Sequence, residues 1–158
     1  MSESPILEER TIGGLHDFLI REVLPKYAKD GQRAVDLGAG SGALAVRLRA
    51  LGLAVLAVDI DTEGFKASIP FRRLDLNDTN FAAALLEKGS FDLVTAVEVI
   101  EHLESPTNFL RNVCRLLNLT GVAIVTTPNV DNLPARVKFL LRGRLRGWTS
   151  LANEPTSP

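Results

Sequence analysis

The sequence predicts an α/β domain with a doubly wound, mostly parallel sheet and helices on both faces. Three observations lead to this fold class. Five apolar runs have the length of strands, stretches with helical periodicity lie between them, and turn residues mark most of the junctions. Strands that alternate with helices form parallel sheets, because a right-handed crossover carries the chain back across the sheet each time.

The N-terminal half of the chain supplies a helix, a strand and a second helix. Residues 14–27 carry apolar side chains at helical spacing. Residues 34–37 are a short apolar run that stops at the glycine-rich loop 38–42. Residues 43–51 are expected to form the next helix, because apolar and basic side chains lie on different sides of it and Gly52 is suited to end it.

The rest of the pattern repeats strand and helix. Two helices are expected, at residues 81–88 and from Pro106 to about residue 117. The first follows the cap-and-turn sequence NDT, and Ser105 with Pro106 suits the start of the second. The remaining strands are expected at residues 53–58, 69–74, 91–97 and 121–127.

Composition limits the class of protein. The 158 residues fit one domain, divided into an N-terminal helical segment (1–32), a core (33–129) and a basic helical tail (130–158). A net charge of -1 implies no global attraction to nucleic acid or to membranes. One cysteine excludes an internal disulfide, the polar N-terminus is unlike a signal peptide, and no apolar run is long enough to span a bilayer. We expect a cytoplasmic protein.

Acidic residues end three of the predicted strands, where parallel sheets bind their ligands. Asp36 lies two residues before the first loop glycine, where it would repel an anionic pyrophosphate and attract a cation. Asp59 could accept both hydroxyls of a ribose, and Asp75 could accept the amine of an adenine. An adenosine with a cationic tail satisfies all three, although Gly38, Gly40 and the residues around them also fit a relaxed dinucleotide pattern.

Five motifs in register resemble those of class I S-adenosylmethionine-dependent methyltransferases, which have a Rossmann-like fold. They are VDLGAGSGAL (35–44), AVDID (57–61), RRLDLND (72–78), FDLVTAVEVIEHLESP (91–106) and GVAIVTTPN (121–129). The VEVIEHL form is similar to the branch that contains ubiquinone-biosynthesis O-methyltransferases and small-RNA 2'-O-methyltransferases. The resemblance implies that S-adenosyl-L-methionine is the cofactor and S-adenosyl-L-homocysteine the product. It implies a cofactor site made of Asp36, Gly38, Gly40, Asp59, Ile60, Asp75, Leu76 and Val97.

The segment after the fourth predicted strand carries the candidates for catalysis. A hydroxyl that attacks the methyl group must lose its proton to a general base or to a metal-bound group. Glu98 and His102 are the candidate bases. If the chain turns helical there, Glu98, Glu101 and His102 share one face and could bind Mg²⁺. The other interpretation is that these side chains only shape the pocket or cap a helix. His16 could approach the cofactor end of the pocket, but an exposed or packed histidine is favoured.

The predicted function is methyl transfer to a hydroxyl of a small-molecule or lipid-like acceptor. The alternatives are a cofactor-binding fragment without catalysis, an RNA methyltransferase, and a nucleotide-dependent oxidoreductase. The basic, apolar segment 136–148 could contact a membrane surface, contact phosphates, or simply cover the domain. The resembling family usually has seven strands, so we expect the final edge strands to be missing and the chain to be truncated or unusually small.

Overall fold

The computed structural model describes residues 7–9, 11–87 and 89–129. The chain divides into two units, residues 1–127 and 128–158, and the description below concerns the first. The basic segment 136–148 and the rest of the predicted tail lie outside the described residues. The predicted division of the chain into one domain with a tail therefore stays a prediction.

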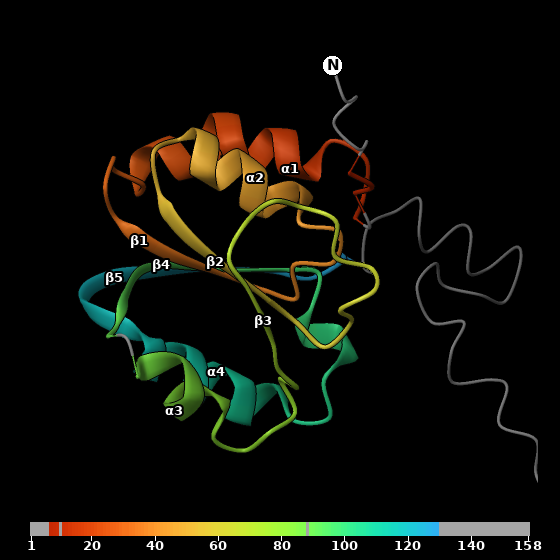
Figure 1. Ribbon diagram of the computed structural model, residues 1–158, viewed down its shortest axis with the longest axis vertical. Coiled ribbons are helices and arrows are strands. Elements are labelled where there is room, and N and C mark those ends of the chain that lie inside the picture. The colour runs from red at the N-terminus through yellow and green to blue at the C-terminus, as the bar shows by residue number, and fades with distance from the viewer. Residues whose placement is uncertain (1–6, 10, 88, 130–158) are drawn as a thin grey trace, which may run out of the picture. The chain divides into compact units, whose positions relative to one another are not determined.

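A five-stranded parallel sheet forms the centre of this unit (Figure 1). Its strands lie in the order β3-β2-β1-β4-β5, and every neighbouring pair is parallel. The order reverses beside β1, which creates the switch point where doubly wound sheets bind ligands. The strands are β1 (Arg33–Leu37), β2 (Ala54–Asp59), β3 (Phe71–Arg73), β4 (Phe91–Val97) and β5 (Leu117–Thr126).

Helices cover both faces of the sheet, as predicted. In Figure 1, α1 and α2 lie above the sheet, while α3 and α4 lie below it. The first helical segment begins as an α-helix, continues as a π-helix and ends as a 3₁₀ helix. Together these three elements match the helix predicted at 14–27. The helical elements are α1 (Leu15–Phe18), η1 (Leu19–Val23), η2 (Leu24–Lys26), α2 (Ala43–Ala50), α3 (Phe81–Leu86), η3 (Ile100–His102) and α4 (Pro106–Leu116).

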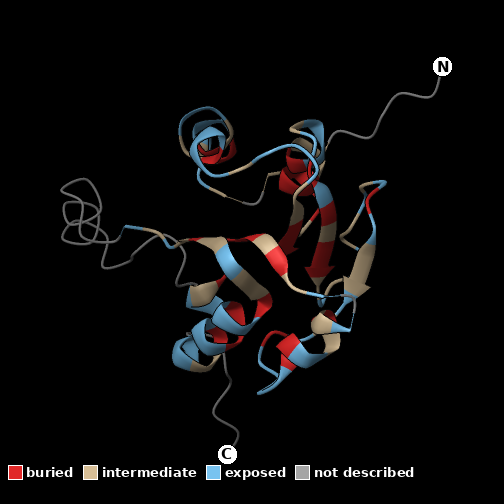
Figure 2. Cartoon of the chain, turned by 90° about the vertical axis from the view of Figure 1, so that its left-hand side faces the viewer, coloured by how far each residue is buried: buried red, intermediate tan, exposed pale blue. Residues whose placement is uncertain are grey.

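Two apolar cores result from this arrangement, one on each face of the sheet. Val35 and Leu37 belong to the core under α3 and α4, which also contains Phe109. Ala34 and Leu93 belong to the core under α1 and α2. Successive β1 side chains alternate between the two cores because side chains in a strand point to opposite faces. Figure 2 shows the result: buried residues concentrate on the sheet and on the helix sides that face it.

The sequence-based boundaries needed small corrections. The strand expected at 69–74 is reduced to β3, because Pro70 has no N–H to donate to a neighbouring strand. The Pro70 carbonyl still accepts a hydrogen bond from the Ala57 amide at 2.8 Å, which holds this segment against β2. The described residues contain the five strands that the sequence predicts. The residues that follow residue 129 lie outside the described ranges, so the absence of further edge strands stays a prediction.

Within the described ranges, no helix is both long enough and apolar enough to cross a bilayer. The helical elements that cover the sheet are short, and the longest of them, α4, has 11 residues. A membrane-spanning helix needs about 20 residues.

Candidate functional site

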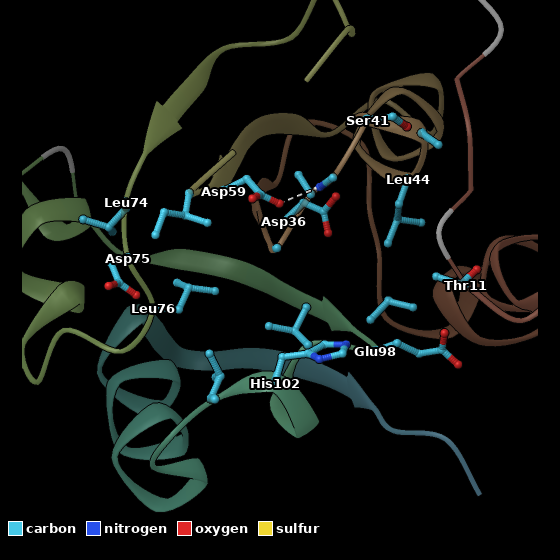
Figure 3. A pocket seen from close by; sticks show the side chains of 18 of the residues that line it. Thr11, Asp36, Ser41, Leu44, Asp59, Leu74, Asp75, Leu76, Glu98 and His102 are labelled. Carbon is cyan, nitrogen blue, oxygen red and sulfur yellow. Dashed lines mark hydrogen bonds between the residues drawn. The ribbon is translucent and has the colours of Figure 1, made fainter. Parts of the chain in front are cut away.

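A cavity of about 340 Å³ opens at the carboxyl ends of β1, β2 and β4 (Figure 3). Ligands bind at this edge of doubly wound sheets, and the sequence places its glycine loop and strand-end acids there. The side chains in Figure 3 come from segments that are far apart in the chain, from Thr11 to His102. All eight residues predicted to bind the cofactor line the cavity: Asp36, Gly38, Gly40, Asp59, Ile60, Asp75, Leu76 and Val97.

The loop after β1 approaches the cavity with backbone rather than with side chains. Gly38 has a φ of 71°, and a Cβ atom there would lie 2.4 Å from Cγ2 of Val99. Only glycine therefore fits this position without displacing its neighbour. The amides of Gly38 and Ala39 both donate to the Val58 carbonyl, at 2.8 and 3.0 Å. These two bonds fix the loop to the end of β2.

Asp36 lies in the cavity wall, with one carboxylate oxygen hydrogen-bonded and the other without a donor among the described residues. Its side chain is 2% exposed, and Oδ1 accepts a hydrogen bond from the Thr95 hydroxyl at 2.7 Å. Oδ2 is buried and has no hydrogen-bond partner in the part of the chain that the structure describes. Burial raises the pKa of Asp36 to about 7; the Thr95 hydrogen bond opposes this rise and the charge of Asp59 adds to it. A buried oxygen that lacks a donor fits a ligand that carries an ammonium group.

Asp59 also lines the cavity, but its carboxylate is fixed by backbone amides. Oδ2 accepts from Gly40 N at 2.7 Å, and Oδ1 accepts from Asp61 N at 2.9 Å. The dashed line in Figure 3 marks the bond from Gly40. A carboxylate has about four acceptor sites, so Asp59 can still accept two ribose hydroxyls. The same residue thus orders the glycine loop and faces the ligand.

The side of the cavity near β3 combines an apolar surface with an acid. Leu74, Leu76 and Asp75 lie together there in Figure 3. Leu76 is buried, whereas Ile60 is largely exposed beside the cavity. The Asp75 carboxylate accepts from Asn77 N at 2.9 Å, which orients it at the start of a turn. Apolar side chains with one acceptor at their edge suit a flat heterocycle with an amino group.

The segment after β4 corrects one prediction. Glu98 has a φ of 55°, in the left-handed region, and only residues 100–102 are helical. Glu98 and His102 line the cavity, but Glu101 is not among the lining residues. Within the described ranges, these side chains form no group of three that could hold a metal ion. The three side chains predicted to bind Mg²⁺ are therefore not on one helical face, because the backbone reverses at Glu98 before the helical turn begins.

Glu98, one of the two candidate bases, is partly buried and hydrogen-bonded. Its Oε2 accepts a hydrogen bond from Ile12 N at 3.2 Å. Burial raises the pKa of Glu98, and the Ile12 hydrogen bond opposes that rise. The charge of Glu101 raises the pKa of Glu98 by a smaller amount, and the charge of His102 lowers it by a smaller amount. A carboxylate with a raised pKa is a stronger base than an exposed one.

The N-terminal segment contributes Glu8 and Thr11 to the cavity, and sequence reasoning missed both, because the residues before Gly14 show no periodicity that could have predicted this. His16, which could approach the pocket according to the sequence, also lines the cavity. His16 is 5% exposed, so the expectation of a packed histidine is confirmed and that of an exposed one is wrong. Its Nδ1 has no hydrogen-bond partner within the described ranges, and burial lowers the pKa of its imidazole.

Backbone contacts hold this N-terminal segment at the cavity. The Ser41 hydroxyl donates to the Glu8 carbonyl at 2.7 Å, and the bond from Ile12 N to Glu98 ties the segment to the residues after β4. Arg47 of α2 pairs with Glu9 and, at 2.7 Å, with Asp17. The cavity is therefore lined by a segment that precedes the sheet in sequence.

Comparisons with known proteins show the family and the fold of this chain. A family model described as a methyltransferase domain matches residues 8–156. A ubiquinone biosynthesis O-methyltransferase from Caulobacter vibrioides is 32% identical over 126 residues, which cover 71% of this chain and 50% of that protein. The chain spans about half the length of these curated relatives.

Solved structures have the same fold. The PH0226 protein from Pyrococcus horikoshii OT3 superposes with a TM-score of 0.66 and 22% identity, over 86% of this chain and 67% of that one. Coclaurine N-methyltransferase bound to N-methylheliamine and S-adenosylhomocysteine superposes with a TM-score of 0.58 and 18% identity, over 75% of this chain and 38% of that one. At these identities the likeness concerns the fold. The chain belongs to the methyltransferase domain family, as its resemblance to class I S-adenosylmethionine-dependent methyltransferases predicts.

Proposed function

We propose that this chain binds S-adenosyl-L-methionine in the cavity and transfers the methyl group to a hydroxyl oxygen of a small-molecule or lipid-like acceptor. One observation carries the proposal. Asp36, which has a buried oxygen without a donor among the described residues, lines the same cavity as two further acids, Asp59 and Asp75, each at or just after the end of a neighbouring strand. An adenosine that carries a cationic amino-acid tail offers a hydrogen-bond donor to each of these three acids.

The residues present fit that cofactor along the cavity. Asp36 would accept from the ammonium of the methionine part, and Asp59 would accept from the ribose hydroxyls. Asp75 and the apolar side chains beside it would hold the adenine. The cofactor supplies a methyl group already activated by the sulfonium charge, so the protein must mainly align donor and acceptor. Fixed loop amides and buried acids are suited to such alignment.

Glu98 and His102 are the proposed groups that take the proton from the acceptor hydroxyl. Both line the cavity, and the raised pKa of Glu98 brings it closer to neutral pH, where a general base works best. The name of the Caulobacter relative supports an oxygen acceptor. A catalytic role for each residue would appear as a lower kcat in Glu98→Gln and His102→Gln, with cofactor affinity retained.

The proposal also includes the location of the protein in the cell and its partners. A cytoplasmic location is consistent with the single cysteine, Cys114, which is exposed and unpaired. The near-zero net charge favours a small acceptor over nucleic acid. For a lipid-like acceptor, the basic segment 136–148 would contact the membrane surface.

The experiment has two stages. Calorimetric titration with S-adenosylmethionine, S-adenosylhomocysteine and NAD tests the cofactor, and we expect binding of the first two alone. Methyl transfer from labelled cofactor is then measured to a soluble phenol, to an alkyl-chain phenol in vesicles, and to a short RNA, with and without a chelator. We expect transfer to a phenol.

The outcomes separate the alternatives. Tight binding of NAD with no response to the methionine cofactors would overturn the proposal. Cofactor binding without transfer to any acceptor would favour the non-catalytic module. Transfer to RNA alone would favour the RNA methyltransferase.

A further inference from the structure

Thr95 donates a hydrogen bond to Asp36, the buried acid in the cavity wall. It lies in the middle of β4 and is completely buried. Its register partner on β1 is Asp36, so the two side chains leave the sheet on the same face at the same level. A threonine inside a sheet core must find an acceptor for its hydroxyl proton, and here that acceptor is part of the cavity wall.

The hydrogen bond has a defined direction. An ionised carboxylate can only accept, so the Thr95 hydroxyl donates to Oδ1 of Asp36, at 2.7 Å. The same hydroxyl lies 3.4 Å from the Val35 carbonyl, which is a weaker second acceptor. Oδ1 is thereby occupied, and Oδ2 is the oxygen left for a ligand.

We propose that Thr95 is a positioning residue for the cofactor: its hydrogen bond fixes the Asp36 carboxylate through Oδ1 and leaves Oδ2 to accept from a ligand ammonium. The inference rests on the proposed function, because it needs a cationic ligand in the cavity. It assigns a binding role to a residue that touches no ligand itself.

The burial of Asp36 and the charge of Asp59 both oppose the ionised form of Asp36, and the Thr95 hydrogen bond favours it. Nearly complete burial favours the neutral acid, and the Asp59 carboxylate does so further. The Thr95 hydrogen bond lowers the pKa of Asp36 and so acts against both. The titratable groups that line the same cavity are Glu8, His16, Asp59, Asp75, Glu98 and His102. None of them hydrogen-bonds to Asp36 within the described ranges.

The test compares Thr95→Val, which keeps the shape and removes the hydroxyl, with Thr95→Ser, which keeps the hydroxyl. Affinity for S-adenosylhomocysteine is measured by calorimetry from pH 6 to pH 9. Each variant is expressed as a ratio to wild type, so that titration of the ligand's own amine cancels. One lost hydrogen bond to a charged group predicts roughly 10-fold weaker binding at pH 7 and a rise of about one pH unit in the midpoint of the profile. The serine variant should follow wild type.

A second background separates positioning from packing. In Asp36→Asn there is no carboxylate to ionise, so adding Thr95→Val should cause no further pH-dependent loss. An unshifted profile in Thr95→Val, or an equal loss in the Asp36→Asn background, would overturn the inference. If the valine variant does not fold, Thr95→Cys, a weaker donor of similar size, replaces it. Wild type that fails to bind S-adenosylhomocysteine at any pH would instead overturn the proposed function.

Discussion

Asp36 and Asp59 lie at or next to the carboxyl ends of neighbouring strands and line one cavity, yet their carboxylates are in different environments. Asp59 accepts hydrogen bonds from two backbone amides and is only partly buried. Asp36 is almost fully buried, accepts from one hydroxyl and has a second oxygen without a donor. The comparison shows that one residue type can serve two purposes. Backbone amides hold the Asp59 carboxylate in the loop, whereas one oxygen of Asp36 has no donor among the described residues and is left for a ligand.

The largest effect is expected from Asp59→Ala. It removes the acceptors for two ribose hydroxyls and the anchor of Gly40, so affinity for S-adenosylhomocysteine should fall by about 100-fold or more. The thermal midpoint of the unliganded protein should also fall, because the loop loses two hydrogen bonds. Calorimetry and thermal melting check both parts. Unchanged affinity would remove Asp59 from the ligand site and leave it a purely structural acid.

Asp36→Asn is expected to separate binding from stability. Affinity should fall about 30-fold at pH 8, because a charged partner of the ligand ammonium becomes neutral. The unliganded protein should melt no earlier than wild type, since the variant removes a buried charge. A loss of stability like that of Asp59→Ala would contradict the proposed difference between the two acids.

The pH dependence of stability sharpens the same difference. The pKa of Asp36 is raised from 3.8 to about 7 in the folded state, so between these values the folded protein holds a proton that the unfolded chain releases. Its contribution to stability is therefore present at low pH and is lost as pH rises from about 4 to about 7. His16, with a lowered pKa, acts in the opposite direction, so the difference between wild type and Asp36→Asn is the quantity to measure. A difference in unfolding free energy that does not change with pH would contradict the raised pKa.

The smallest effect is expected from Asp75→Ala. This acid is exposed, and its proposed ligand contact is a single amino group. Affinity should fall only about 5-fold, which corresponds to one hydrogen bond in a solvated position. Titration with an adenosine analogue that lacks the exocyclic amine provides the control, since the variant should lose nothing further against it. A loss as large as that of Asp59→Ala would contradict the order proposed for the three acids.

The cofactor half of the cavity could be predicted from the sequence because its residues sit at strand ends. A glycine loop and acids at the ends of apolar runs are visible without coordinates, and parallel strands bring those ends to one edge. The segment after β4 could not be predicted in the same way. The pattern from Glu98 to His102 fits a helix, but the backbone takes a left-handed conformation at Glu98 and only a short turn follows.

The sequence by itself determined the order of elements, the class of sheet and which strand-end residues would line the cavity. Those features depend on local periodicity and on the positions of Gly38, Asp59 and similar residues at strand ends. Only the tertiary structure decided the hydrogen bonding of the site's acids and the direction in which their pKa values shift. The Thr95 hydroxyl donates to Asp36 across 59 positions of sequence, and Glu8, Thr11 and His16 of the N-terminal segment line the cavity. Burial and hydrogen bonding set the pKa of a buried acid, and both depend on which distant segments pack against it.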